Sequence, residues 1–484
     1  MNHLPQQKNS VDQTAEPQQL TADPQQLKPQ TQQSHAKSMK KFCLINPRVI
    51  YTILSAVIII VGSYFAIRYA QGDFRVTKEG ILRESGLLAA NSFPPGAQVY
   101  VNDKLVTATD DTIYLEPEVY QVKIEKDGYS PWKKTLTIKK ELVTQTNAKL
   151  FPAAPSITPL TFTGARNLLP SPDGRKIVYY SDGTSTEKKK GIYLLELTDG
   201  TIFQKSAKQI AEADLDQIKT LDFIWSPDSS QIMVIMPERQ VLIEVNEKVD
   251  LSTLPDISFK RKQILSEWEE EMYLRERQYM EEFPEEMLKI ATQSAKNVYL
   301  SPDKKRLLYT ATASAIIPED IVPPVPARNT QPEERALQPG GIYVYDREED
   351  KNFKVAEETG DAARQKALLA QDLDQKDPLT LISSPSAFTT LQASSAAKTA
   401  SNFNVYHSSL FINTLQWFAD STHLIFVKDN AIQVMEYDSA NQTTLYSGPF
   451  MEDFVYPWPD GSRVLILTKF SPDTPANLYA IELD

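Results

Sequence analysis

Residues 171–180 read SPDGRKIVYY, and this pattern returns four more times before the chain ends. The five copies run from Ser171 to Tyr180, Trp225 to Val234, Leu300 to Tyr309, Trp417 to Phe426 and Trp458 to Ile466. In each copy a polar turn precedes a strongly apolar strand: Asp accepts hydrogen bonds from nearby amides, and in four of the five copies Pro presets φ for the turn. We expect these residues to shape repeated turns: Pro172, Asp173, Pro227, Asp228, Pro302, Asp303, Asp420, Pro459 and Asp460.

A second apolar strand follows each copy. These strands are predicted at residues 191–197, 241–245, 341–346, 431–437 and 477–483. Each unit is therefore a meander of short strands, which cannot bury both of its faces alone. Repetition around an axis solves that problem, because neighbouring meanders then cover each other.

This repeat resembles the TolB-type β-propeller. The resemblance implies a propeller of five or six blades over residues 156–484. A blade needs about 40 to 50 residues, whereas the copies are unevenly spaced along the chain. The longer gaps hide a degenerate blade or hold insertions, which we place at residues 255–295 and 318–405.

The first insertion is predicted to be helical over residues 258–294. A helical stripe is formed by Ile264, Trp268, Met272, Tyr279, Phe283 and Met287, and Pro284 suits the first turn of a second helix. We favour a lid on the propeller rim over a partner-docking hairpin. The second insertion, at 318–340 and 347–405, is predicted to be irregular. Asp372, Asp374 and Asp377 hint at calcium, but the glycine and glutamate of an EF-hand loop are missing, so no metal site is predicted.

A second pattern of short alternating strands precedes the repeats. Residues 120–126 alternate apolar and polar side chains with period two, and Asp127-Gly128 then favours a hairpin turn. The stretches at 94–102, 115–117, 120–122 and 128–132 together resemble a PEGA domain over residues 92–152. Glu118 departs from the family pattern, which has glycine in this loop. The resemblance implies a small β-sandwich of a surface protein, either in contact with the envelope or, as we favour, acting as a spacer.

A membrane anchor is predicted near the N-terminus. Residues 49–67 contain no charged side chain and span roughly 28 Å as a helix, which matches the hydrocarbon core of a bilayer. We expect a transmembrane helix at 49–68 in contact with lipid. The alternatives are a buried core helix, which would carry a polar stripe over this length, and a cleaved signal peptide, whose apolar run is shorter. Residues 1–48 are expected to be a disordered cytoplasmic tail, and residues 69–91 a stalk, for which a helix from Glu79 to Ala90 is one interpretation.

The flanking charges predict the orientation. Lys37, Lys40, Lys41 and Arg48 precede the apolar run without an acidic residue among them. The positive-inside rule then places the N-terminus in the cytoplasm and the bulk of the chain on the extracytoplasmic side of the cell membrane.

Composition and the lack of known motifs exclude several classes of function. The net charge of −12 argues against nucleic acid as a partner. Cys43 is the only cysteine, and His3, His35, His407 and His423 are scattered, so neither a disulfide nor a metal cluster is expected. No catalytic or cofactor motif is found. We expect a binding or scaffolding protein of the bacterial cell envelope with a protein or glycan partner and no cofactor. The alternatives are a propeller-based enzyme acting on glycans or peptides and a membrane signal receptor.

Overall fold

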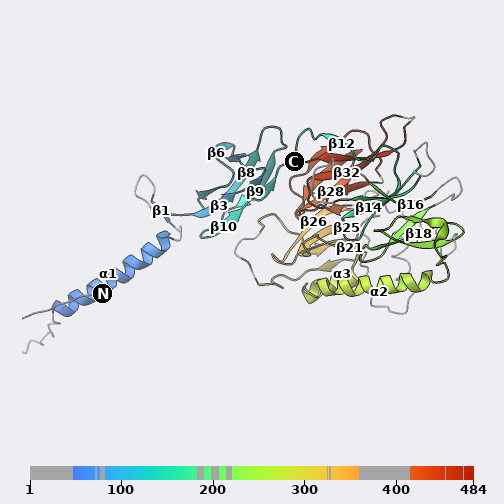
Figure 1. Cartoon of the computed structure of the whole chain (residues 1–484). Helices are drawn as coiled ribbons and strands as arrows, with labels where there is room; N and C mark the ends of the chain where they lie inside the picture. The colour runs from blue at the N-terminus through green and yellow to red at the C-terminus, as the bar shows by residue number, and fades with distance from the viewer. Residues whose placement is uncertain are drawn as a thin grey trace, which may run out of the picture. The chain divides into compact units, whose positions relative to one another are not determined.

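The structure is a computed structural model, and the chain is mainly β with one N-terminal apolar helix (Figure 1). The described residues are 47–70, 74–76, 82–182, 190–197, 207–213, 221–323, 325, 329–358, 415–452, 454–471 and 474–483. Contact clustering divides the chain into two units, Met1–Phe65 and Ala66–Asp484.

The N-terminal helix α1 spans Pro47–Ala70. Within it, Ile50–Arg68 has a mean hydropathy of 2.2, and none of this segment is buried inside the protein. The helix is long and apolar enough to cross a membrane. Membrane anchors and signal sequences near an N-terminus both contain such a helix.

The next folded part is a small sandwich. One sheet has the order β10-β3-β7 and the other β6-β5-β8-β9. The strands are β3 (Gly86–Ala90), β5 (Gln98–Val101), β6 (Lys104–Ala108), β7 (Asp111–Leu115), β8 (Val119–Glu125), β9 (Trp132–Thr137) and β10 (Val143–Gln145). Two short pairs accompany them, β1 (Phe74–Val76) with β2 (Leu82–Glu84) and β4 (Ser92–Phe93) with β11 (Ala148–Lys149). Alternate side chains such as Val99, Val122 and Ile124 fill the core between the sheets.

The predicted stalk needs correction. The helix expected from Glu79 to Ala90 is wrong, because β2 and β3 occupy its described part. Strand β3 pairs with β7 and β10, so the sandwich begins before residue 92. Leu88 and Ala90 alternate into the core. The period of two within a short apolar run therefore prevails over helix propensity.

Five mainly antiparallel sheets make up the described residues of the C-terminal part. The first contains β13 (Arg166–Pro170), β14 (Lys176–Ser181), β15 (Gly191–Glu196) and β16 (Lys208–Glu212), with β20 (Val249–Asp250) at its edge, where β16 and β20 form the one parallel pair. The second contains β17 (Asp222–Trp225), β18 (Gln231–Ile235) and β19 (Gln240–Glu244). The third contains β21 (Ala295–Leu300), β22 (Arg306–Ala311), β25 (Gly341–Asp346) and β26 (Lys351–Glu357).

The fourth sheet contains β27 (Gln416–Trp417), β28 (His423–Lys428), β29 (Ala431–Glu436) and β30 (Thr443–Tyr446). The fifth contains β31 (Val455–Pro457), β32 (Arg463–Thr468) and β33 (Asn477–Glu482), joined by β12 (Ile157–Pro159). Ile157 pairs with Ile481, so one sheet holds both the first and the last strand of this part of the chain. A small ladder of β23 (Ala315–Ile316) and β24 (Ala336–Leu337) accompanies the third sheet.

Buried apolar side chains join these sheets in a fixed order. One cluster joins the first sheet to the second, and others join the first to the fifth, the fifth to the fourth and the fourth to the third. Tryptophans reinforce two of these contacts: Trp225 Nε1 donates to Leu169 O at 3.0 Å, and Trp417 Nε1 donates to Tyr299 O at 3.3 Å. The order is therefore third, fourth, fifth, first, second.

Helices lie at the two ends of this series, where an uncovered sheet face would expose apolar side chains (Figure 1). Helix α2 (Arg261–Met280) packs Leu265 and Trp268 on Met233 of the second sheet. Helix α3 (Glu285–Gln293) packs on the third sheet through Met287 and Ile290. Both helices fall within the range predicted to be helical. Leu265 and Met280 are buried, whereas the predicted stripe contained Ile264 and Tyr279, which are only partly buried.

The second insertion is shorter than predicted. Residues 351–357 were expected to be irregular, but they form β26, the outer strand of the third sheet. Phe353 is buried there against the fourth sheet, so packing fixes a strand that the lysine-rich sequence did not predict. Asp372, Asp374, Asp377 and His407 lie outside the described residues.

Candidate functional site

The five repeated turns share one local geometry. In every copy the turn aspartate accepts a hydrogen bond from the backbone amide two residues later, at 2.8 to 3.1 Å. The residue after each aspartate has a positive φ, between 60° and 73°. These residues are Gly174, Ser229, Lys304, Ser421 and Gly461. The carboxylates that were predicted to shape turns therefore bind backbone within their own turns.

The turns also bind one another. The amide of Asp173 donates to Ser229 Oγ at 3.1 Å, and Lys176 Nζ donates to the carbonyl of Ser229 at 2.9 Å. The third and fourth copies repeat this arrangement, with Asp303 N donating to Ser421 Oγ at 3.0 Å. The turns of successive sheets therefore meet at the same edge of the assembly.

A cavity of about 370 Å³ lies where these turns meet. Turns of the first, third, fourth and fifth copies line it, and Pro172, Pro302 and Pro459 contribute to its walls. Trp417 and Tyr456 add aromatic surface, while Arg175 and Lys304 add positive charge. Burial, followed by the charge of Asp173, raises the pKa of Tyr456, whose hydroxyl donates to the carbonyl of Gly174 at 3.2 Å. Aromatic walls with a few polar groups are typical of a site that binds a ligand by shape.

Helix α2 contacts the repeated turns of the second and third copies. Arg275 Nη1 donates to the carbonyl of Pro227 at 2.9 Å. Burial raises the pKa of Glu276 to about 8, although the charge of Lys304 opposes this shift. Lys304 also lies 5.5 Å from the centre of the Tyr279 ring. The helix thus brings a titratable carboxyl against the third turn, and sequence patterns gave no sign of it.

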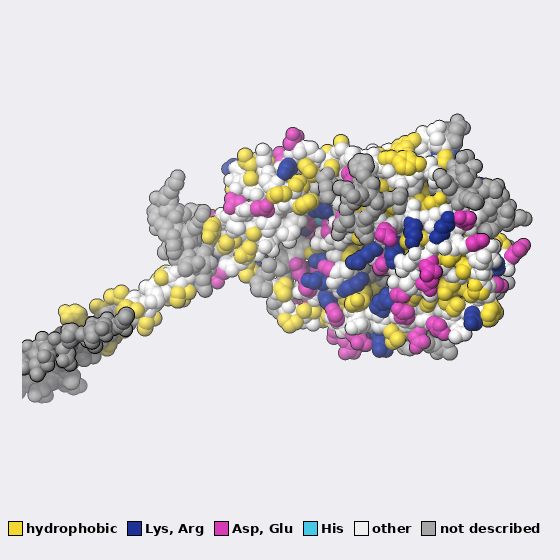
Figure 2. Space-filling model, viewed as in Figure 1, with side chains coloured by type: hydrophobic (Ala, Val, Ile, Leu, Met, Phe, Trp, Pro, Cys, Tyr) yellow, Lys and Arg dark blue, Asp and Glu magenta, His cyan; other side chains and the backbone are white. Residues whose placement is uncertain are grey.

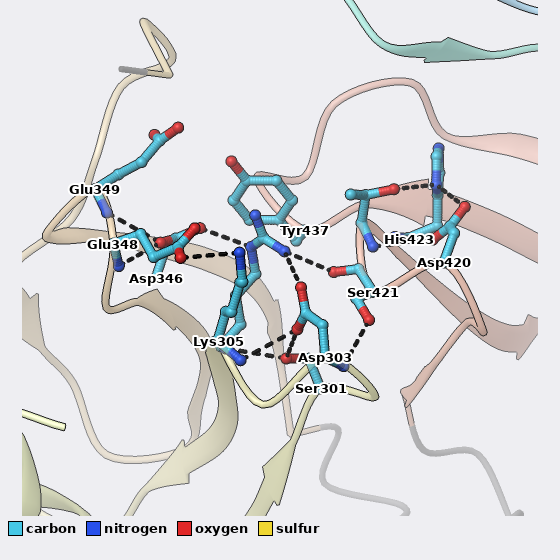
Figure 3. Close-up of polar contacts among 12 residues, drawn as sticks. Ser301, Asp303, Lys305, Asp346, Glu348, Glu349, Asp420, Ser421, His423 and Tyr437 are labelled. Carbon is cyan, nitrogen blue, oxygen red and sulfur yellow. Dashed lines mark hydrogen bonds and ion pairs between the residues drawn. The ribbon is translucent and has the colours of Figure 1, made fainter. Parts of the chain in front are cut away.

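Arg306 organises a buried polar cluster behind the third turn. Its Nε lies 2.7 Å from Asp346 Oδ2, and its Nη1 donates to Ser421 O at 3.0 Å. The guanidinium carbon lies 4.3 Å from the centre of the Tyr437 ring. Burial opposes the charge, but Asp346 and other acidic groups raise the pKa of Arg306. Figure 3 shows Asp303, Asp346, Ser421 and Tyr437 converging from separate segments. This cluster joins the third and fourth sheets.

His423 is buried within the fourth copy. Its Nδ1 lies 2.9 Å from Asp420 Oδ2 and 3.1 Å from Thr422 Oγ1 (Figure 3). The imidazole also packs edge-on against Phe151, with ring centres 5.4 Å apart. His423, to which the sequence analysis assigned no metal cluster, is therefore a buried histidine held by a turn aspartate, in an arrangement that stabilises the turn.

The sandwich binds the fourth sheet directly. Lys134 Nζ lies 2.5 Å from Glu436 Oε2 and 2.5 Å from Asp438 Oδ2, and its side chain is only 9% exposed. Burial would lower the pKa of Lys134, but the two carboxylates outweigh it and raise the pKa. Trp132 Nε1 donates to Glu436, and the amide of Lys133 donates to Asn441 at 2.6 Å. The two folded parts are thus fixed by buried ionic contacts as well as by the connecting chain.

Several of these residues could not be identified from sequence. Arg306 stands three residues after the turn aspartate, where Lys176 and Arg463 stand in the first and fifth copies, so a recurring basic residue was a usable signal. Lys134, Tyr456 and Glu276 have no such signal, because their partners lie far away in sequence or on another element. Among the described residues, no group of three or more His, Cys, Asp or Glu could hold a metal ion.

Comparison with known protein families identifies the small sandwich. Residues 85–154 match the family described as PEGA domain, which confirms the resemblance noted from the sequence. No curated protein matches the chain.

Solved structures that are similar to this chain include two TolB proteins and an oligogalacturonate lyase. A protein assigned as TolB from Agrobacterium tumefaciens has a TM-score of 0.20 at 11% identity, covering 67% of this chain and 83% of that one. TolB from Acinetobacter baumannii has a TM-score of 0.19 at 14% identity, covering 75% of this chain and 60% of that one. Oligogalacturonate lyase from Vibrio parahaemolyticus has a TM-score of 0.23 at 9% identity, covering 75% and 86%. Scores this low carry no argument about function.

Proposed function

We propose that this chain, which carries a PEGA domain at residues 85–154, is a membrane-anchored binding or scaffolding protein of the bacterial cell envelope. Its C-terminal sheets form a β-propeller that binds a segment of another envelope protein. The observation that carries the proposal is the cavity at the meeting point of four repeated turns.

The anchor rests on α1. Ile50–Arg68 has a mean hydropathy of 2.2, and no part of it is buried against the rest of the protein. Apolar side chains are therefore exposed along the whole helix. In water such a helix would expose an extended apolar surface, whereas in a bilayer that surface is favourable. Four basic residues before the helix favour a cytoplasmic N-terminus and an extracytoplasmic bulk. An N-terminal epitope tag retained in the membrane fraction would support an uncleaved anchor; loss of the tag would indicate a cleaved signal sequence.

The propeller rests on the order in which the sheets pack. Five sheets stack face to face in one series. The pairing of β12 with β33 places the first and the last described strands of this part of the chain in the same sheet. The second and third sheets have no shared apolar cluster among the described residues, and α2 and α3 cover them instead. We infer a propeller in which this helical pair occupies the place of a sixth blade.

The binding role rests on what the turns do. The turn carboxylates are hydrogen-bonded to their own backbones, so a non-enzymatic role is favoured. The cavity presents proline, aromatic and basic side chains. Such a surface suits an extended peptide with apolar and acidic side chains.

Site-specific photo-crosslinking in living cells tests this role. A photoreactive amino acid at Arg175, on the cavity wall, should capture a discrete protein. The same probe at Lys428 is the matched control. Lys428 ends β28 of the fourth sheet, whereas the repeated turn that lines the cavity precedes the start of β28. The captured protein, once purified, should bind the purified chain and lose affinity for an Arg175→Glu variant. Equal capture at both positions would refute a binding site in the cavity.

A further inference from the structure

The PEGA domain exposes a group of large apolar side chains to solvent. They are Leu105, Val106, Tyr114, Val119 and Val143, with exposed fractions of 59%, 48%, 38%, 60% and 44%. Apolar side chains are visible on the surface of the sandwich in Figure 2. A cluster of exposed apolar side chains on a small domain is a sign of contact with another surface.

These five side chains lie at one end of the sandwich, whereas Phe93, which is 55% exposed, follows β3 at the other end. Tyr114 and Val143 both pair with Leu87, the second residue of β3. Val119 begins β8, and the pairing of Val101 with both Val122 and Lys104 brings the β5–β6 turn beside it. We call this the proximal end, because the chain enters the sandwich there at Gly86. The distal end carries the β8–β9 turn at Asp127 and Gly128.

The chain connection limits how far the proximal end can lie from the end of α1. Helix α1 ends at Ala70 and β3 begins at Gly86. Residues 71–85 can therefore separate them by at most roughly 50 Å even when fully extended. Strands β1 and β2 pair within this segment and shorten its reach.

The charges at the proximal end nearly cancel. Exposed or partly exposed lysines are Lys104, Lys139 and Lys140, and exposed acids are Asp103, Glu116, Glu118 and Glu141. Attraction to anionic headgroups would need a basic excess, which this end lacks. Any attachment to lipid must therefore come from burial of the apolar side chains.

We propose that the proximal end of the PEGA domain rests on the lipid bilayer, with Leu105, Val119 and Val143 in its interfacial region. This inference builds on the proposed membrane anchor. The second contact would restrict the rotation of the domain about its tether. Because Lys134 fixes the sandwich to the fourth sheet, the propeller would be held at a defined orientation to the membrane.

Depth-dependent fluorescence quenching tests the contact. The full chain carrying Cys43→Ser and Val119→Cys would be labelled with an environment-sensitive fluorophore and assembled into phosphatidylcholine nanodiscs, one chain per disc. Spin-labelled lipid with its quencher high on the acyl chain should quench this probe several-fold more than a probe at Asp127→Cys. Val119 and Asp127 bracket β8, so the two probes compare opposite ends of the same sandwich.

The outcomes separate the contact from the anchor. Failure of the chain to assemble into discs would refute the anchor itself. Assembly with equal quenching at both positions, or with no quenching at residue 119, would refute only the lipid contact. Leu105→Cys provides a second probe at the proximal end if Val119→Cys unfolds. Quenching should be the same when phosphatidylglycerol is added; a large increase would indicate electrostatic binding and contradict the apolar mechanism.

Discussion

Lys134 of the PEGA domain lies 2.5 Å from Glu436 of the fourth sheet, although 302 residues separate them in sequence. Asp438 binds the same ammonium group at 2.5 Å. Three charges in one buried contact are costly to assemble, because each loses its hydration. The contact therefore favours one relative position of the two folded parts over all others.

Replacement of Lys134 should destabilise the protein strongly. Lys134→Met leaves Glu436 and Asp438 buried without a counter-charge, and removal of one partner of a buried pair costs about 3 to 5 kcal/mol. Lys133→Met is the matched control, since Lys133 is exposed and contacts Asn441 through its backbone amide. Thermal unfolding should show a large drop in Tm for Lys134→Met only. Adding Glu436→Gln should restore part of the loss; a further drop would mean that the pair is not coupled.

Alanine at Gly174 should be more harmful than alanine at Gly96. Both glycines have φ of 73°, so both substitutions strain the backbone. A Cβ at Gly174 would lie 3.1 Å from the Tyr456 hydroxyl, whereas nothing lies within 4 Å at Gly96. We expect Gly174→Ala to cost about 1 kcal/mol more in free energy of unfolding. Denaturant titration measures the difference, and equal losses would show that Tyr456 does not constrain the turn.

Glu276 should make the protein less stable as pH rises. Burial raises its pKa to about 8, so the folded chain retains a proton between the ordinary value of 4.5 and 8 that the unfolded chain has lost. Stability therefore falls across this window. Glu276→Gln removes the effect and should stabilise the protein at pH 8, by on the order of 1 to 3 kcal/mol, with little gain at pH 5. Glu270→Gln, at an exposed position of α2, is the control and should show no such pH-dependent gain.

Asp420 should have the opposite pH dependence. Burial opposes its charge, but His423 and Lys149 hold the pKa of Asp420 well below its usual value of 3.8. A lowered pKa contributes stability above the unfolded value, and this contribution is lost as pH falls through the folded pKa. Asp420→Asn should therefore be less stable than the native chain at pH 7. The gap should narrow as pH falls below about 4, which Tm measurements across this range would check. A constant gap would indicate that the loss is not electrostatic.

The repeated turns and their strands were within reach of sequence analysis, because their causes are local. Proline, aspartate and the residue that follows them fix a turn through contacts only a few positions apart. Period-two alternation from Tyr120 to Lys126 likewise predicts a half-buried strand without reference to the rest of the chain. The uncharged run from residue 49 to residue 67 predicts a membrane helix from length and composition alone.

The sequence alone therefore determined the mainly β class, the apolar helix, the PEGA resemblance and the five turns. Only the tertiary structure decided that α2 and α3 cover the second and third sheets, that residues 351–357 form a strand, and that Lys134 meets Glu436. The cavity, too, exists only after four turns from distant segments meet. These features depend on packing and on charge pairing between residues far apart in the chain, which no local periodicity or turn chemistry encodes.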